Sequence, residues 1–152
     1  MLPTPQKYFL TAACAEGDTP LTAFDRALLA GKIGNLNLVR VSSILPPGAV
    51  YCPGLAIPEG SLVPVAYGYI ISEVPGELIS AAVGVGVTAD SFGVIMEFAG
   101  RCPQAQARSQ IQKMLAEAFA VRKLALADLK IASVEHQVEK IGCALAAVPM
   151  WY

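Results

Sequence analysis

The sequence predicts one α+β domain, with about seven strands and two principal helices. Three observations lead to this prediction. Many apolar residues stand in short runs rich in Val and Ile and bounded by Gly or Pro, a pattern typical of strands. Two stretches, 21–30 and 104–122, combine helical spacing of apolar residues with helix-start signals. A length of 152 residues suits a single domain.

The N-terminal part is expected to form a strand over 8–14, followed by the helix over 21–30. Thr19 favours a helix start because its hydroxyl can accept from the first free backbone N–H groups, and Pro20 suits the first helical position. Gly31 fits a C-terminal cap. The stripe of this helix predicted to face the core consists of Leu21, Phe24 and Leu28.

The C-terminal half is expected to continue as strands around the longer helix. Pro75-Gly76 is a strong turn signal, and Pro103 stands where the helix would open. His136 is the only histidine, and we interpret it as a structural residue of a strand. After a loop or edge segment over 48–61, the predicted elements are strands 62–74, 79–88 and 93–100, the helix, and a terminal hairpin of strands 130–138 and 141–148.

The segment 84–89 reads GVGVTA, which matches the G-x-G-x-x-A pattern of dinucleotide-binding loops. That pattern binds a pyrophosphate only where it joins a strand to a helix. Residues 90–93 instead indicate a turn into the next strand. We therefore expect Gly84 and Gly86 to allow close packing of the sheet against another layer.

The composition excludes several classes of function. The chain is 55% hydrophobic and 15% charged, and its mean hydropathy is +0.53. A small domain buries a modest fraction of its surface, so this excess indicates either a membrane or an interface between subunits. No stretch approaches the ~18 uninterrupted apolar residues of a spanning helix, and we expect an oligomer. A net charge of −1 argues against nucleic acid as a partner.

The N-terminus and the cysteines bear on location. The apolar run 8–15 is too short for a convincing signal-peptide core and follows Pro3 and Pro5. We therefore expect a cytoplasmic protein. The four cysteines show no C-x-x-C spacing and have no paired histidines, which favours reduced thiols over a metal site or a disulfide framework.

A pair of serines, Ser42-Ser43, ends the apolar strand predicted over 35–41 and comes just before two prolines. Two solvated serines at a strand end are the plain interpretation. The alternative is self-processing, in which the Ser43 hydroxyl attacks the Ser42 carbonyl to give an ester. β-Elimination then leaves a dehydroalanine that hydrolyses to a pyruvoyl group. Asn37, on the Ser43 face of an extended strand, could supply the amide that stabilises the oxyanion.

Two acids stand next to apolar residues in predicted elements. Glu97 lies in the middle of the strand 93–100 and is either a solvated residue of an edge strand or a buried general acid, whose raised pKa keeps it protonated. Asp25 borders the apolar stripe of the first helix. It is either a solvated acid or a carboxylate that receives a cation, because a carboxylate can bind a guanidinium through two parallel hydrogen bonds.

Four blocks, GNLNLVRVSSILPP, LVPVAYGYIISEVPGELISAA, GVIMEFAG and VEHQVEKIGCALAA, resemble the pyruvoyl-dependent arginine decarboxylases over about residues 8–152. The resemblance implies autocatalytic cleavage of the Ser42–Ser43 bond into a β chain of 1–42 and an α chain of 43–152, with Ser43 becoming the pyruvoyl group. It also implies that Glu97 is the catalytic acid. In the matching block AFDRALL, it implies that Asp25 contacts the substrate's guanidinium.

The same resemblance implies a sheet sandwich with helices outside, of the αββα type, in trimers or dimers of trimers with active sites between subunits. The expected reaction converts L-arginine to agmatine and CO2 through a Schiff base on the pyruvoyl group, and its role is either polyamine biosynthesis or acid resistance. Three alternatives stay open: an uncleaved non-catalytic trimeric assembly protein, a pyruvoyl decarboxylase of another amino acid, and a serine hydrolase. The hydrolase is disfavoured because no G-x-S-x-G motif surrounds Ser43.

Overall fold

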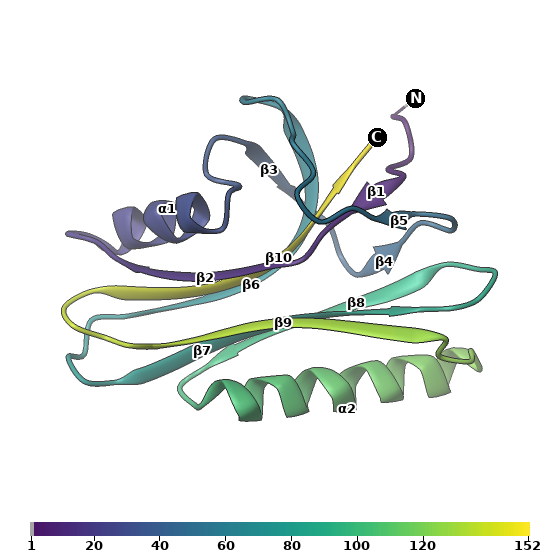
Figure 1. The fold of residues 1–152 in the computed structure, drawn as a ribbon. Coiled ribbons are helices and arrows are strands. Elements are labelled where there is room, and N and C mark those ends of the chain that lie inside the picture. Colours follow the sequence, from purple (N-terminus) through teal and green to yellow (C-terminus); the bar gives the residue numbers. More distant parts are fainter. Residues whose placement is uncertain (1) are drawn as a thin grey trace.

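Two β-sheets pack face to face, and each carries one helix on its outer surface (Figure 1). This arrangement comes from a computed structural model that describes residues 2–152. In chain order the elements are β1 (Lys7–Tyr8), β2 (Thr11–Glu16), α1 (Pro20–Ala30), β3 (Asn37–Arg40), β4 (Ile44–Leu45), β5 (Val50–Tyr51), β6 (Leu62–Ser72), β7 (Leu78–Val87), β8 (Gly93–Gly100), α2 (Gln104–Arg122), β9 (Asp128–Gln137) and β10 (Gly142–Trp151).

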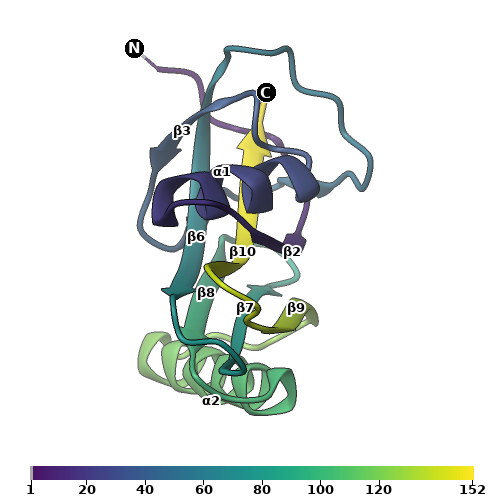
Figure 2. The same ribbon diagram turned by 90° about the vertical axis from the view of Figure 1, so that its left-hand side faces the viewer.

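The first sheet has six strands in the order β3-β6-β10-β1-β5, with β2 also paired to β10. The second has four strands in the order β4-β8-β7-β9. Helix α1 covers the first sheet and α2 covers the second, as the side view shows (Figure 2). The predicted α+β sandwich with outer helices is therefore confirmed. No helix within residues 2–152 combines the length and apolarity that crossing a membrane requires.

The helix boundaries follow the sequence signals closely. Helix α1 begins at Pro20, and Thr19 and Thr22 cap it reciprocally. Gly31 is the C-terminal cap residue, but the left-handed conformation falls on the next residue, Lys32, with φ of 64°. Helix α2 spans the predicted range 104–122.

The predicted core stripe of α1 is only partly right. Phe24 and Leu28 are half-buried, but Leu21 is 73% exposed. Ala23 and Ala27 are the fully buried residues instead. Their small side chains let the helix lie close to the first sheet, and the larger residues beside them are then only partly covered.

The predicted terminal hairpin is wrong. Strands β9 and β10 are joined by a short turn, but β9 pairs with β7 in the second sheet, whereas β10 pairs with β6 and β2 in the first. The connection is thus an arch between sheets. The turn residues signal a reversal of the chain, but they do not reveal whether the flanking strands pair with each other or face each other across the core.

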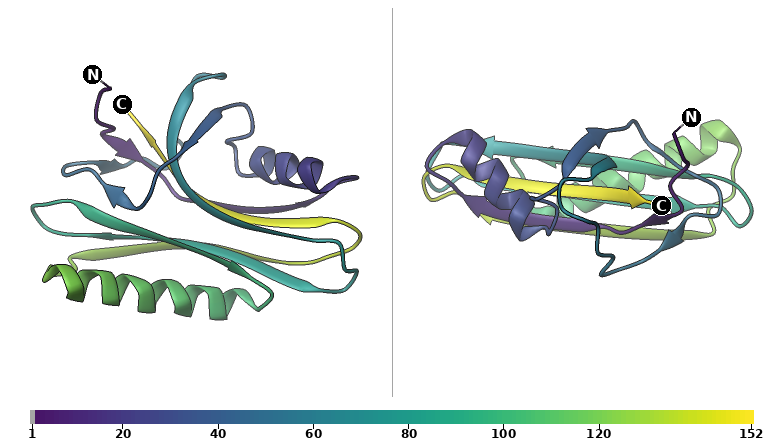
Figure 3. Two further views of the ribbon diagram at one scale, coloured as in Figure 1. Left: turned by 180° about the vertical axis from the view of Figure 1, so that it is seen from behind. Right: turned by 90° about the horizontal axis from the view of Figure 1, so that it is seen from above.

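The first predicted strand and the strand before the serine pair also differ from expectation. The stretch 8–14 breaks into β1 and β2, which pair with different parts of β10. This pairing of β1 with β10 places the two ends of the chain side by side (Figure 3). The stretch 35–41 forms only β3, and the short strand β4 follows the serines unpredicted.

Three apolar layers hold the structure together. One lies between the sheets, one under α1 and one under α2. In the layer under α2, a Cβ on Gly84 would collide with Ile111, and a Cβ on Gly86 would lie 2.7 Å from a ring atom of Phe119. The glycines of the segment 84–89 therefore serve close helix–sheet packing, as predicted.

Candidate active site

The Ser42–Ser43 bond lies where the chain passes from one sheet to the other. Strand β3 pairs in parallel with β6, and Val41 N donates to Val65 O at 3.0 Å beyond the strand's end. Two residues later Ile95 N donates to Ser43 O at 2.7 Å, which starts the pairing with β8. The bond between the serines therefore spans the gap between the sheets. Ser42 is exposed and Ser43 is half-buried.

The same crossing brings Ser43 close to Glu97. Strand β4 pairs antiparallel with β8, with Ile44 opposite Val94, so Ser43 stands opposite Ile95. Glu97 is two residues further along β8, and alternation puts it on the face of Ile95, toward the space between the sheets. Diagonal neighbours of this kind lie about 7–8 Å apart in an antiparallel pair. Two residues that the sequence suggested separately are thus diagonal neighbours where the chain crosses between the sheets.

Glu97 lies between the two sheets at an open margin of the sandwich. A Cβ on Gly68 of β6 would lie 3.3 Å from the Glu97 side chain, so the glycine leaves room for it. The side chain is 24% exposed. Burial raises the pKa of Glu97 above its usual range, and the charge of Arg40 opposes this only in part. Glu97 can therefore hold a proton at a higher pH than an exposed glutamate, as a proton donor must.

Arg40 is a residue of the site that sequence reasoning missed. Its Nη2 lies 4.0 Å from Glu97 Oε1 and donates to Tyr67 O at 2.6 Å. The guanidinium also lies 4.5 Å from the centre of the Tyr67 ring. A charged residue in an otherwise apolar strand, two positions before the serine pair, was the available signal. It is the same kind of signal that drew attention to Glu97.

Asn37 does not reach Ser43 within one chain. Its Nδ2 donates to Gly60 O at 2.8 Å, at the start of β3. Arg40, at the other end of β3, is already about 10 Å away at the usual rise per strand residue. Ser43 lies beyond it. An oxyanion donor has to lie about 3 Å from the developing charge, so Asn37 is not in that position here.

Asp25 lies on the outer surface of α1, with the first sheet between it and Glu97. Because stacked sheets lie about 10 Å apart, one chain does not bring Asp25 to the serine pair. The acid is flanked one turn away on each side by Leu21 and Leu29, which are 73% and 48% exposed. An apolar surface around an acid is suited to contact with another protein surface.

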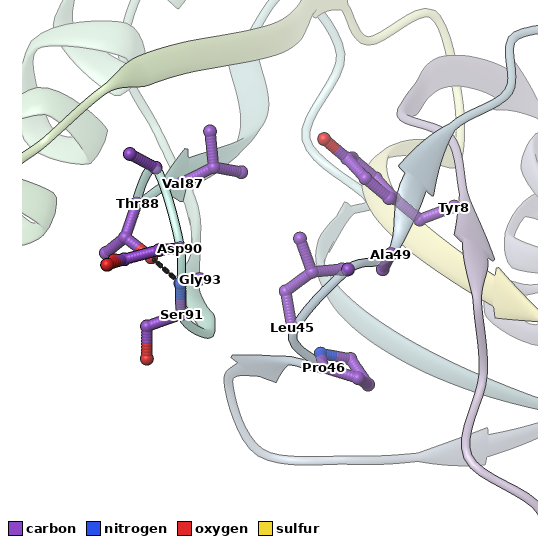
Figure 4. Close-up of a pocket in the computed structure, with 11 residues that line it drawn as sticks. Tyr8, Leu45, Pro46, Ala49, Val87, Thr88, Asp90, Ser91 and Gly93 are labelled. Carbon is purple, nitrogen blue, oxygen red and sulfur yellow. Dashed lines mark hydrogen bonds between the residues drawn. The ribbon is translucent and has the colours of Figure 1, made fainter.

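The larger cavities of the described chain lie elsewhere. One of about 370 Å³ opens between the β4–β5 loop and the β7–β8 turn, with Tyr8 on one side and the turn residues Thr88, Asp90 and Ser91 on the other (Figure 4). Another of about 500 Å³ lies beside the C-terminal end of α1 and the loop around Gly54. Neither is lined by Ser42, Ser43 or Glu97. Ser42, Ser43 and Glu97 therefore lie outside these two cavities in the single chain.

Comparison with known proteins adds independent findings. Residues 7–152 match the family described as pyruvoyl-dependent arginine decarboxylase. A protein of that name from Methanocaldococcus jannaschii is 49% identical over 150 residues, which cover 97% of this chain and 91% of the relative. The protein of that name from Pyrococcus horikoshii is 45% identical and covers 97% and 96% of the two chains. That from Methanococcus maripaludis strain C7 is 43% identical, at 97% and 92%.

Proposed function

The chain belongs to the pyruvoyl-dependent arginine decarboxylase family, and from this premise we propose how its own residues carry out the reaction. The activity is that of a carbon–carbon lyase, which converts L-arginine to agmatine and CO2 and depends on a covalently bound pyruvoyl group. The observation that carries the assignment of residues is the meeting of Ser43 and Glu97 at the crossing between the sheets.

Ser43 is the source of the pyruvoyl group. Its hydroxyl adds to the Ser42 carbonyl, and the peptide nitrogen leaves to form an ester. Loss of the Ser43 α-proton then expels the Ser42 carboxylate and leaves dehydroalanine, which takes up water and releases ammonia. Overall, one water is consumed, and the products are chain 1–42 with a new carboxylate, chain 43–152 with a pyruvoyl end, and ammonia. A bond that spans two sheets suits this reaction, because both sides are held by strand pairing.

A pyruvoyl carbonyl at position 43, held where Ser43 pairs with Ile95, would supply the sink for the electron pair released with CO2. Glu97 then delivers a proton to the α-carbon. Its place beside Ser43 and its raised pKa both support this role.

We infer that Asp25 and Asn37 act from neighbouring chains. Asp25 would bind the substrate's guanidinium through two parallel hydrogen bonds, and Asn37 would donate to the oxyanion formed at Ser42. Both lie away from Ser43 in a single chain, and Asp25 is flanked by exposed leucines. A homotrimer, or a dimer of trimers, with its sites between subunits would unite them. The cytoplasmic location and the role in polyamine biosynthesis stay predictions.

The test uses the reactivity of the pyruvoyl carbonyl toward a hydrazine. Purified protein should release agmatine and CO2 from L-arginine, and phenylhydrazine should abolish this activity by forming a hydrazone, which adds the mass of phenylhydrazine less one water to the fragment 43–152. A Ser43→Ala chain, which cannot form the carbonyl, should show neither activity nor adduct. Full activity after the treatment, with no adduct, would overturn the proposal. Faster release of CO2 from another amino acid would show that this chain is a pyruvoyl decarboxylase of that amino acid instead.

A further inference from the structure

We propose that cleavage transfers the guanidinium of Arg40 from Glu97 to the new carboxylate of Ser42, and that this exchange leaves Glu97 free to hold the catalytic proton. The inference rests on the proposed function, because it requires both the cut at Ser42–Ser43 and the use of Glu97 as an acid. It makes Arg40 a positioning residue that couples the two events.

Arg40 is only loosely bound to Glu97 in the uncut chain. The 4.0 Å separation between Nη2 and Oε1 is an ion-pair distance but too long for a hydrogen bond. Within residues 2–152 the guanidinium makes one hydrogen bond, to Tyr67 O, although it has five N–H donors. The side chain is 53% exposed. Arg40 therefore has donors and space available for a second carboxylate.

Cleavage creates that carboxylate within reach. Ser42 is two residues from Arg40, so in an extended chain the two lie on the same side, about 6.6 Å apart. Ser42 is exposed, and after the cut it ends a chain that β8 no longer holds through Ser43. A carboxylate can bind a guanidinium through two parallel hydrogen bonds, which is a stronger contact than the present 4.0 Å pair.

The exchange changes the charges around Glu97. Strand β3 supplies Arg40, which is the one charged side chain acting on Glu97 among the described residues. Strand β6 contributes Gly68 and the backbone of Tyr67, and β7 contributes the apolar Val83 opposite Glu97. Once Arg40 has turned to Ser42, desolvation acts on Glu97 without a compensating charge, and the neutral acid is favoured. Cleavage thus raises the pKa of Glu97 further and favours its protonated form once the carbonyl has formed.

The test compares the ionisation of Glu97 before and after the cut. Glutamate labelled with 13C at the side-chain carboxyl is followed by NMR as pH varies, and the Glu97 signal is identified by its absence in Glu97→Gln. The uncut state is the Ser43→Ala chain. We expect Glu97 in the processed enzyme to titrate about one pH unit higher or more, a tenfold change in proton affinity.

Arg40 variants show whether the guanidinium causes this difference. In the uncut Ser43→Ala background, Arg40→Gln should already give Glu97 the higher midpoint of the processed enzyme, so the result does not depend on whether Arg40→Gln is cleaved. Arg101→Gln is the matched control, because it removes an arginine paired with another acid, Glu77, at 2.9 Å. It should leave the difference between uncut and processed Glu97 unchanged.

If Glu97 titrates with the same midpoint pH in the uncut and processed forms, the proposed transfer of Arg40 is wrong. A structure of the processed enzyme with Arg40 still beside Glu97 would also contradict it. Cleavage and decarboxylation are measured on the same samples. If both occur while the midpoints are equal, the proposed function stands and only this inference fails. If the wild-type chain is not cut at all, the proposed function and the inference fail together.

Discussion

Two acid–base pairs bridge the sheets of this sandwich beside two different crossings of the chain. At the serine pair, Glu97 of the second sheet faces Arg40 of the first at 4.0 Å. At the β9–β10 arch, Glu16 of the first sheet contacts His136 of the second at 2.5 Å. The first pair is loose and open to exchange, whereas the second is closely bonded.

The two glutamates consequently differ in pKa. Desolvation alone would raise the pKa of Glu16, but hydrogen bonds from the backbone of Lys140 and from His136 outweigh it and hold that pKa below its usual range. For Glu97 desolvation prevails, because Arg40 compensates only in part. An acid with its oxygens satisfied is suited to holding two sheets together. An acid left short of partners is suited to carrying a proton.

Replacing Glu97, the acid of the loose Glu97–Arg40 pair, should have the largest effect on activity. Glu97→Gln is nearly isosteric, so the chain should fold and be cleaved, but the α-carbon loses its proton donor. We expect decarboxylation of arginine to fall by roughly 10²–10⁴-fold, the usual worth of general acid catalysis. The assay is agmatine release per pyruvoyl end, counted by mass spectrometry. Normal turnover by fully processed Glu97→Gln would remove Glu97 from the mechanism.

A comparable loss is expected at Asp25, which we place across an interface from the Glu97–Arg40 pair. Deleting one partner of a partly buried ion pair costs roughly 3–5 kcal/mol, so Asp25→Asn should lower kcat/KM for arginine by roughly 10²–10⁴-fold. Citrulline, which keeps the shape without the charge, should lose less, and lysine should be a poor substrate of the native enzyme because its ammonium lacks the planar fork.

Asp18→Asn is the matched control for this experiment, because Asp18 is also exposed and precedes the same helix. It should leave kcat/KM for arginine unchanged. If Asp25→Asn leaves the ratio of arginine to citrulline turnover unchanged, Asp25 is a surface acid and the guanidinium contact lies elsewhere.

At the closely bonded Glu16–His136 pair, the expected effect is on the stability of the fold. Glu16→Gln, made in the uncut Ser43→Ala chain, should lower the free energy of unfolding by about 1.5–3 kcal/mol at neutral pH, the range for hydrogen bonds to a charged group. Urea unfolding at one fixed protein concentration measures it. Asp128→Asn, which removes the exposed pair with Lys130, should cost less than Glu16→Gln, because exposed ion pairs contribute little to stability.

The pH dependence of this loss follows from the lowered pKa of Glu16. A depressed folded-state pKa contributes stability that is fully present above the unfolded value, about 4.3, and is lost as pH falls through the folded value. The difference in stability between the chain that keeps Glu16 and the Glu16→Gln chain should therefore shrink as pH falls below about 4.3. A difference that stays constant down to complete acid unfolding would contradict the assigned role of the carboxylate.

The main elements were predicted well because apolar periodicity and turn residues are local signals, whereas the layers were implied by the family resemblance. Strand β8 and helix α2 lie at the predicted residues. The β9–β10 arch was mistaken for a hairpin because strand pairing is decided by distant partners. The burial of Ala23 in place of Leu21 follows from how closely α1 approaches the sheet, which helical spacing does not specify.

The site was predictable only in part. Ser43, Glu97 and Asp25 came from chemical character together with a family resemblance, but the adjacency of Ser43 and Glu97 depends on the β4–β8 register, and β4 was not predicted. Arg40 was missed because its partners, the Tyr67 carbonyl and Glu97, come from two other strands. Pairings across a sandwich cannot be deduced from residue spacing within one strand.

The central claim is that the chain cuts itself between Ser42 and Ser43, and denaturing mass spectrometry of the purified protein tests it most directly. We predict fragments of 42 and 110 residues, the larger carrying a pyruvoyl end that resists N-terminal sequencing. Ser43→Ala should remain a single chain, whereas Ser42→Ala should still be cut, because the attacking hydroxyl and the attacked carbonyl both remain. A single intact wild-type chain after prolonged incubation under active conditions would contradict the account.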